Sequence, residues 1–76
     1  MDSSTKEIAG IISEVTGMPA EKIQADSKLI EDLNLSSLHI MVIFSEIAGR
    51  FDVDVTEEQL LSVRTVGDLA KIMGSN

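Results

Sequence analysis

Apolar residues recur with a helical period in three segments of this 76-residue chain, and this pattern limits the possible folds more than any other feature. Within residues 5–15, the apolar side chains that share one helix face are Ile8, Ile11, Ile12 and Val15. Ser4 and Glu7 form a capping-box signature at the start of this segment, and Gly17 and Pro19 mark its end. The pattern predicts a first helix.

A second helix is predicted from Ser37 to Arg50. Its apolar positions are Leu38, Ile40, Met41, Val42, Ile43, Phe44, Ile47 and Ala48. The run "IMVIF" alone is also compatible with a buried strand. We favour the helix because the apolar pattern continues to Phe51, and because the alternating "FDVDV" is too short to pair with it as a stable sheet.

Two more helices are predicted in the last third of the chain. Thr56 and Gln59 form a second capping box, which starts a short helix through about Val63. Thr65 caps a last helix that ends before Gly74, and one face of it carries Val66, Leu69, Ala70 and Met73.

The connection between the first and second helices, residues 18–35, has no sustained period. A short helical turn is expected at Pro19, which suits a first helical position. We expect the connection to be ordered, because it carries apolar anchors at Ile23, Leu29, Ile30, Leu33 and Leu35. The chain is therefore predicted to be all-α, a small four-helix bundle with three main helices, one short helix and a long first connection, in a single domain over residues 1–76.

Composition excludes several classes of function. There is no cysteine, so neither a disulfide framework nor a nucleophilic thiol is available. The chain has thirteen acidic and six basic residues, so its net charge is negative. This charge disfavours binding to nucleic acids and anionic membranes. It is consistent either with basic protein partners or with solubility alone. The start "MDSSTKEIAG" lacks the features of a secretory signal, and no apolar run is long enough for membrane insertion, so we expect a cytoplasmic location.

Catalysis by this chain alone is not expected. His39 is the only histidine, and Ser37 lies two positions before it, so the two side chains point to different sides of a helix. A solvent-facing histidine is the simpler interpretation. The acids of "FDVDVTEE" alternate as calcium ligands do, but they lack the glycine turn and loop length of an EF-hand, so solvated surface acids are favoured.

The stretch "EDLNLSSLHI" places two serines at the start of the second helix. Ser36 suits the N-cap position, and Ser37 is then the first helical residue. A helical cap alone explains both serines. The unpaired N–H groups and positive dipole end of a first turn also favour a phosphoryl group on a hydroxyl there.

The segments "EDLNLSSLHIMVIFSEIAGRFDVDV" and "RTVGDLAKI" resemble acyl carrier proteins, and the match spans nearly the whole chain. Ser37-Leu38 match the last two residues of the family's Asp-Ser-Leu attachment motif, and Asp32-Leu33 match the Asp-Leu pair that precedes it. The resemblance implies that Ser37 carries 4′-phosphopantetheine, whose thiol holds an acyl group as a thioester. It also implies a non-enzymatic, monomeric carrier that meets a phosphopantetheinyl transferase and acyl-transferring or condensing enzymes.

The chain departs from the family pattern in two ways. Ser36 stands where family members usually have an aspartate, a carboxylate thought to help hold magnesium during transfer of the arm. The second helix of family members usually exposes several acidic residues, whereas Glu46 is the only acidic residue in 39–50. We therefore expect partners to rely on apolar contacts with Leu38, Met41 and Val42, with weaker electrostatic steering.

The cargo is expected to be an acyl chain, buried in an aliphatic interior to which three adaptable methionines contribute: Met18, Met41 and Met73. A carrier of amino acids or polyketides is an alternative, since the fold and the arm are shared. A different class of function is an unmodified helical interaction module, in which Ser36 and Ser37 only cap a helix.

Overall fold

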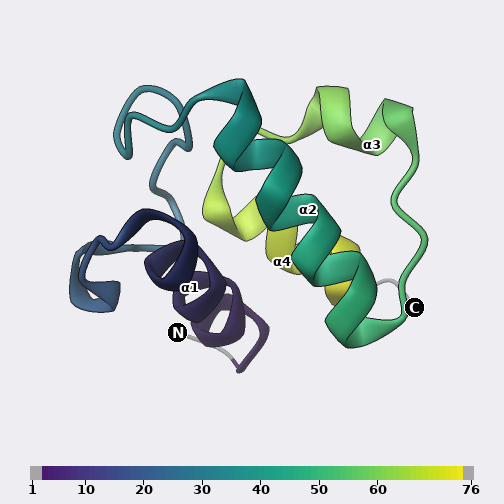
Figure 1. The fold of residues 1–76 in the computed structure, drawn as a ribbon, viewed down its shortest axis with the longest axis horizontal. Coiled ribbons are helices and arrows are strands. Elements are labelled where there is room, and N and C mark those ends of the chain that lie inside the picture. Colours follow the sequence, from purple (N-terminus) through teal and green to yellow (C-terminus); the bar gives the residue numbers. More distant parts are fainter. Residues whose placement is uncertain (1–2, 75–76) are drawn as a thin grey trace.

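Four α-helices, one of them short, are present in residues 3–74, the part of the chain that this computed structural model describes (Figure 1). The helical elements are α1 (Ser3–Thr16), a 3-10 turn η1 (Ala20–Lys22), α2 (Ser37–Phe51), α3 (Glu57–Ser62) and α4 (Val66–Gly74). α1 packs against both α2 and α4. Residues 3–74 contain no strand, only an isolated bridge between Lys28 and Thr65. The predicted all-α four-helix bundle is confirmed.

The core is largely aliphatic, with Phe44 as an aromatic member, and most of it is formed by the apolar faces that the helical period predicts. Almost fully buried side chains come from α1, α2 and α4, among them Ile8, Ile12, Ile43, Ile47, Val66 and Leu69. No buried side-chain polar atom of residues 3–74 lacks a hydrogen-bond partner. Within the same residues, no helix is both long and apolar enough to cross a membrane.

Capping side chains set the start of the two C-terminal helices, as predicted. The Thr56 hydroxyl accepts from the Gln59 N–H at 3.1 Å, and the Gln59 side chain accepts from the Thr56 N–H at 2.9 Å. At α4, the Asp68 N–H donates to the Thr65 hydroxyl at 3.2 Å, while the Asp68 carboxylate accepts from the Thr65 N–H at 3.1 Å. Both predicted caps are therefore confirmed.

Other predicted boundaries differ from the structure. α1 begins at Ser3, so Ser4 lies inside the helix and the capping box proposed for Ser4 and Glu7 is wrong. α4 includes Gly74, which was expected beyond its end. α2 extends one residue further than predicted, to Phe51, and Asp52 then ends it with a left-handed backbone, at a φ of 52°.

The long first connection is ordered and fixes the start of α2. Ile23, Leu29, Leu33 and Leu35 are buried as expected, but Ile30 is 61% exposed, so its role as an anchor was wrong. Pro19 precedes η1 as its N-cap rather than occupying the first helical position.

Backbone hydrogen bonds join this connection to the segment between α3 and α4. The Leu29 N–H donates to the Arg64 carbonyl at 2.9 Å, and the Val66 N–H donates to the Ser27 carbonyl at 3.1 Å. The first connection, which leads into α2, is thus hydrogen-bonded to the residues that precede and begin α4.

Candidate functional site

Ser36 caps α2 as predicted. Its backbone is extended (φ −84°, ψ 167°), and its hydroxyl accepts from the His39 N–H at 3.2 Å. This bond satisfies one of the unpaired N–H groups at the start of the helix. The residue before the first helical position therefore uses its hydroxyl to hold the helix end.

His39 completes a reciprocal capping box that the sequence analysis missed. The Ser36 N–H donates to His39 Nδ1 at 3.2 Å, and the Ser36 hydroxyl lies 3.1 Å from the same nitrogen. Nδ1 is the acceptor of the bond from the Ser36 backbone, because a backbone N–H can only donate. The expected solvent-facing histidine is in fact half-buried and hydrogen-bonded. The sequence signal for this capping box was the position of His39, three residues after the N-cap, where glutamate or glutamine is usual.

Ser37 is the first residue of α2, and its side chain is exposed. Within residues 3–74, its hydroxyl forms no hydrogen bond, and the His39 ring bonds to Ser36 instead. The two adjacent serines therefore differ: the Ser36 hydroxyl is engaged in the cap, and the Ser37 hydroxyl is free at the positive end of the helix dipole.

Asp32 shapes the loop ahead of the site. Its carboxylate accepts from the Lys28 N–H at 2.8 Å, and its own N–H donates to the Lys28 carbonyl at 2.9 Å. Leu33 and Leu35 of the same loop are buried in the core. Asp32 therefore closes the loop by hydrogen bonds and Leu33 anchors it in the core, and this loop leads directly to the exposed Ser36 and Ser37.

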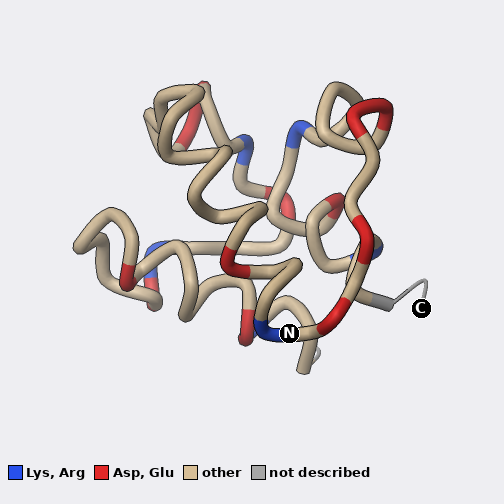
Figure 2. Tube along the Cα trace, turned by 45° about the vertical axis from the view of Figure 1, so that its right-hand side comes forward, with Lys and Arg blue, Asp and Glu red and all other residues tan. Residues whose placement is uncertain are grey.

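Charges are distributed unevenly around α2. Its single acid, Glu46, accepts from Arg50 at 3.0 Å, and Arg50 also contacts Glu14 of α1 at 2.7 Å. The hydrogen bond to Glu14 is the main cause that raises the pKa of the Arg50 guanidinium above its ordinary value. Figure 2 shows other acids along the connector to α3 and at the start of that helix, namely Asp52, Asp54, Glu57 and Glu58.

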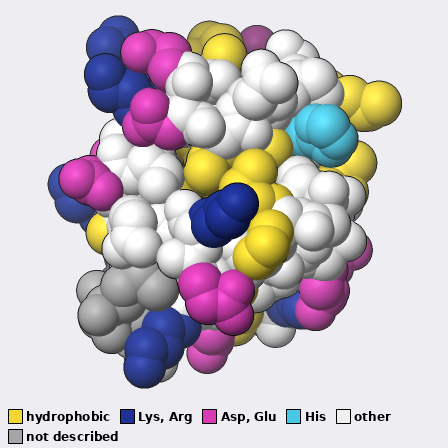
Figure 3. Space-filling model, turned by 90° about the vertical axis from the view of Figure 1, so that its left-hand side faces the viewer, with side chains coloured by type: hydrophobic (Ala, Val, Ile, Leu, Met, Phe, Trp, Pro, Cys, Tyr) yellow, Lys and Arg dark blue, Asp and Glu magenta, His cyan; other side chains and the backbone are white. Residues whose placement is uncertain are grey.

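The exposed face of α2 near Ser37 is apolar. Leu38 is 69% exposed, Met41 60% and Val42 41%, and their spacing of three and four residues puts them on one face of the helix. Figure 3 shows hydrophobic side chains next to the histidine. Met41 was expected in the interior, which is wrong, whereas Met18 and Met73 are half-buried against the core.

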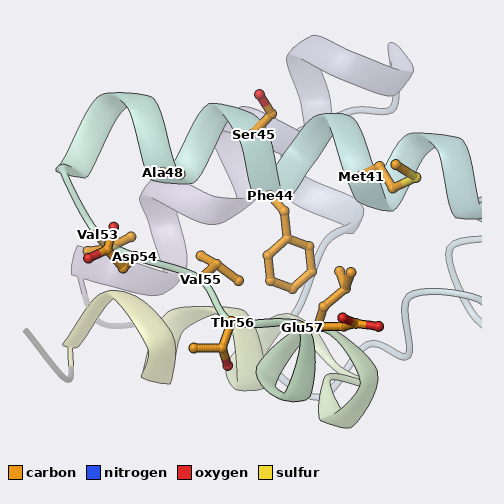
Figure 4. Close-up of a pocket in the computed structure, with 10 residues that line it drawn as sticks. Met41, Phe44, Ser45, Ala48, Val53, Asp54, Val55, Thr56 and Glu57 are labelled. Carbon is orange, nitrogen blue, oxygen red and sulfur yellow. The ribbon is translucent and has the colours of Figure 1, made fainter.

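An open groove of about 540 Å³ lies between α2, the following connector and α3. Its apolar lining consists of Met41, Phe44, Ala48, Val53, Val55 and Leu60. Figure 4 shows the Phe44 ring and the Val55 side chain pointing into the space between α2 and the connector. The groove offers a surface for an apolar ligand within three turns of Ser37.

No group of acids and histidine within residues 3–74 has the arrangement of a metal site. The alternating acids of the connector, Asp52 and Asp54, are exposed. The arrangement at Ser37 therefore consists of a free hydroxyl, the dipole of a capped helix, an apolar face and an apolar groove.

Comparison with known proteins identifies relatives over most of the chain. The family model described as "Phosphopantetheine attachment site" matches residues 6–73. An acyl carrier protein of Beutenbergia cavernae is 35% identical over 72 residues, which cover 90% of this chain and 88% of the relative. A probable acyl carrier protein of Caulobacter vibrioides is 36% identical over 72 residues, 95% of this chain and 83% of the relative.

Proposed function

Because the chain belongs to the acyl carrier protein family, whose members bear phosphopantetheine, we propose that Ser37 is the attachment residue and that the cargo consists of acyl groups. The chain is a non-catalytic carrier with 4′-phosphopantetheine as its prosthetic group, and it interacts with a phosphopantetheinyl transferase and with acyl-processing enzymes. The thiol of that group supplies the thioester chemistry that a cysteine-free chain lacks. The proposed setting is fatty-acid or related lipid or secondary-metabolite biosynthesis.

The free hydroxyl of Ser37 is the observation that carries this proposal. Modification of Ser36 would disturb its bonds to His39 and with them the helix cap, whereas Ser37 is exposed and unbonded within the described chain. A phosphodiester on Ser37 would lie at the helix end whose N–H groups and dipole stabilise negative charge. The residues present therefore fit the prosthetic group.

The groove beside α2 supports an acyl cargo. It is apolar along most of its length, with Phe44, Val55 and Leu60 among its lining residues. Burial of a methylene group contributes about 0.8 kcal/mol. An aliphatic chain attached through Ser37 would therefore stabilise the folded protein by entering the groove. Leu38, Met41 and Val42, exposed beside Ser37, are proposed to contact the enzymes that act on the arm.

Intact mass spectrometry tests the attachment. The protein is co-expressed with a phosphopantetheinyl transferase as wild type, Ser37→Ala and Ser36→Ala. We expect the mass of one arm on the wild type and on Ser36→Ala, the matched control, and none on Ser37→Ala. Loss of the added mass only in Ser36→Ala would contradict the assignment. Absence of any added mass with several transferases would favour an unmodified interaction module.

A further inference from the structure

His39 is the side chain at the start of α2 whose charge can change near neutral pH. It is the only histidine of the chain, which also has no cysteine. Histidine is the side chain that ordinarily gains or loses its charge between about pH 5 and 8. A change of side-chain charge in this range therefore belongs to His39.

The neutral and the protonated ring fit the same capping box with different hydrogen bonds. The Ser36 N–H donates to His39 Nδ1 at 3.2 Å, and a protonated ring, with hydrogen on both nitrogens, cannot accept this bond. It can donate Nδ1–H to the Ser36 hydroxyl oxygen, which lies 3.1 Å from Nδ1. That oxygen has a second lone pair besides the one that accepts the His39 N–H at 3.2 Å. The hydroxyl cap therefore persists in both states, and only the bond from the Ser36 N–H is exchanged.

The helix start without the arm opposes the protonated ring. His39 is the third residue of α2, where the positive end of the helix dipole repels a cation. Protonation also removes the bond from the Ser36 N–H. The first turn of α2 contains no acid that could compensate. A negative charge added at Ser37 would supply what this turn lacks.

The other charges near the first two turns of α2 form a constant background. They come from the first connection, the segment before α4 and the start of α3: Lys28, Glu31, Asp32, Arg64 and Glu57. Glu31 pairs with Lys28 at 3.5 Å, and the Asp32 carboxylate accepts from the Lys28 N–H at 2.8 Å. From α1, Glu14 is held by Arg50 at the opposite end of α2. Carboxylates, lysine and arginine ordinarily keep their charge between about pH 5 and 8.

We propose that His39 is the charge partner of the arm: a phosphodiester on Ser37 favours the protonated ring, which gives up the Ser36 N–H and donates to the Ser36 hydroxyl. This inference rests on the proposed function. Ser37 and His39 share the first turn of α2, so their charges interact although side chains at this spacing do not face each other. The proton comes from the solvent, and no covalent bond of the arm changes. By linkage, loading favours protonation to the same extent that protonation favours the loaded carrier.

NMR titration of the single histidine ring tests this coupling. The protein is expressed with and without a phosphopantetheinyl transferase, and the ring signals are followed at low salt, where screening is weak. We expect the pH at which half of the rings are protonated to be higher by about half a unit or more in the loaded form. An equal or lower value in the loaded form would overturn the inference.

His39→Gln separates the charge of this residue from its role in the cap. Glutamine at this position also completes a capping box, but it cannot be protonated. In wild type, the loaded form should gain stability over the unloaded form by about threefold in the unfolding equilibrium constant on going from about pH 8 to about pH 5, because the protonated ring is favoured by the arm. In His39→Gln, the difference between loaded and unloaded protein should be the same at both pH values.

Urea unfolding of the four proteins measures this difference. The same pH dependence in His39→Gln as in wild type would overturn the inference and leave the attachment at Ser37 intact. Failure of wild-type Ser37 to load would overturn the proposed function, and this inference with it.

Discussion

At the scale of single residues, the start of α2 combines a neutral cap with a free hydroxyl. Ser36 and His39 bond to each other through side chains that are not carboxylates, at 3.2 Å in both directions. The family's usual aspartate would bring a negative charge to this position. The cap is preserved without that charge, so the helix start keeps its geometry while the electrostatic environment of Ser37 changes.

Asp68 is the residue whose titration has a defined effect on stability. Its carboxylate accepts from the Arg64 N–H at 2.9 Å and from the Thr65 N–H at 3.1 Å, and these bonds, chiefly the one from Arg64, lower the pKa of Asp68 below its ordinary value. The pKa of Asp68 is thus lower in the folded protein than in the unfolded chain, where it is about 3.9. The stabilisation is present above the unfolded pKa and is lost as the pH falls through the folded pKa.

We therefore predict that Asp68→Asn lowers the free energy of unfolding by about 1 kcal/mol at about pH 7, because the charge at this cap is lost. The difference from wild type should be smaller at about pH 2, because the Asp68 carboxylate loses its charge as the pH falls through its folded pKa. Urea unfolding followed by circular dichroism measures it. Asp26→Asn, in an exposed turn, is the control and should have little effect at either pH. A difference of equal size at both pH values would contradict this account.

At the scale of elements, the helices that the sequence predicts best are those with local start signals. Thr56, Thr65 and Ser36 cap as expected, because a capping side chain acts on N–H groups within three residues of it. The capping box predicted at Ser4 is wrong because the pattern of serine followed by glutamate three residues later lies inside α1.

The buried face of α2 was harder to predict than its limits. Apolar residues occupy more than one face of this helix, so the pattern alone cannot distinguish buried Ile43 from exposed Met41. Ile30 shows the same difficulty in an irregular segment, where no period identifies the side that faces the core. In both cases, tertiary packing decides which apolar side chains are buried, and the candidate site is built from those left exposed.

Two helical glycines should respond oppositely to alanine. A Cβ at Gly67 would lie 3.1 Å from the Ala25 carbonyl oxygen, which also accepts the Gly67 N–H at 2.8 Å, whereas a Cβ at Gly49 of α2 meets no atom within 4 Å. We predict that Gly67→Ala destabilises the protein by about 1–2 kcal/mol through strain between α4 and the first connection. Gly49→Ala should stabilise it by up to about 1 kcal/mol, because alanine favours helix.

Thermal unfolding of both variants measures these effects. Each variant serves as the control for the other, since the substitution is the same and both sites are helical, but only Gly67 has the close contact with Ala25. Stabilisation by Gly67→Ala would show that the first connection yields easily, contrary to the network of backbone bonds that ties it to α4.

At the scale of the whole molecule, the groove beside α2 links cargo to stability. An acyl chain bound there would bury apolar surface of Val55 and Leu60, which are only half-buried without it. Each buried methylene contributes about 0.8 kcal/mol. In a domain of this size, about 1 kcal/mol shifts Tm by roughly 4–8 °C. Stability should therefore report how much of the cargo is buried.

We predict that Tm of the loaded carrier rises by roughly 3–6 °C for each methylene that enters the groove as the acyl chain lengthens from two to about eight carbons. Differential scanning calorimetry of the loaded forms measures it. Leu60→Ser, which makes the groove wall polar, should reduce the increase relative to its own unloaded form. A Tm that does not change with chain length would show that the chain remains in solvent.

Tandem mass spectrometry of the loaded protein tests the central claim most directly, because it locates the arm to one of two adjacent serines. In a peptide that spans Ser36 and Ser37, cleavage between them separates the two hydroxyls. We predict that the added mass appears only on fragments that contain Ser37. Added mass on fragments that end at Ser36 would contradict the assignment and, with it, the division of roles between the capping hydroxyl and the free one.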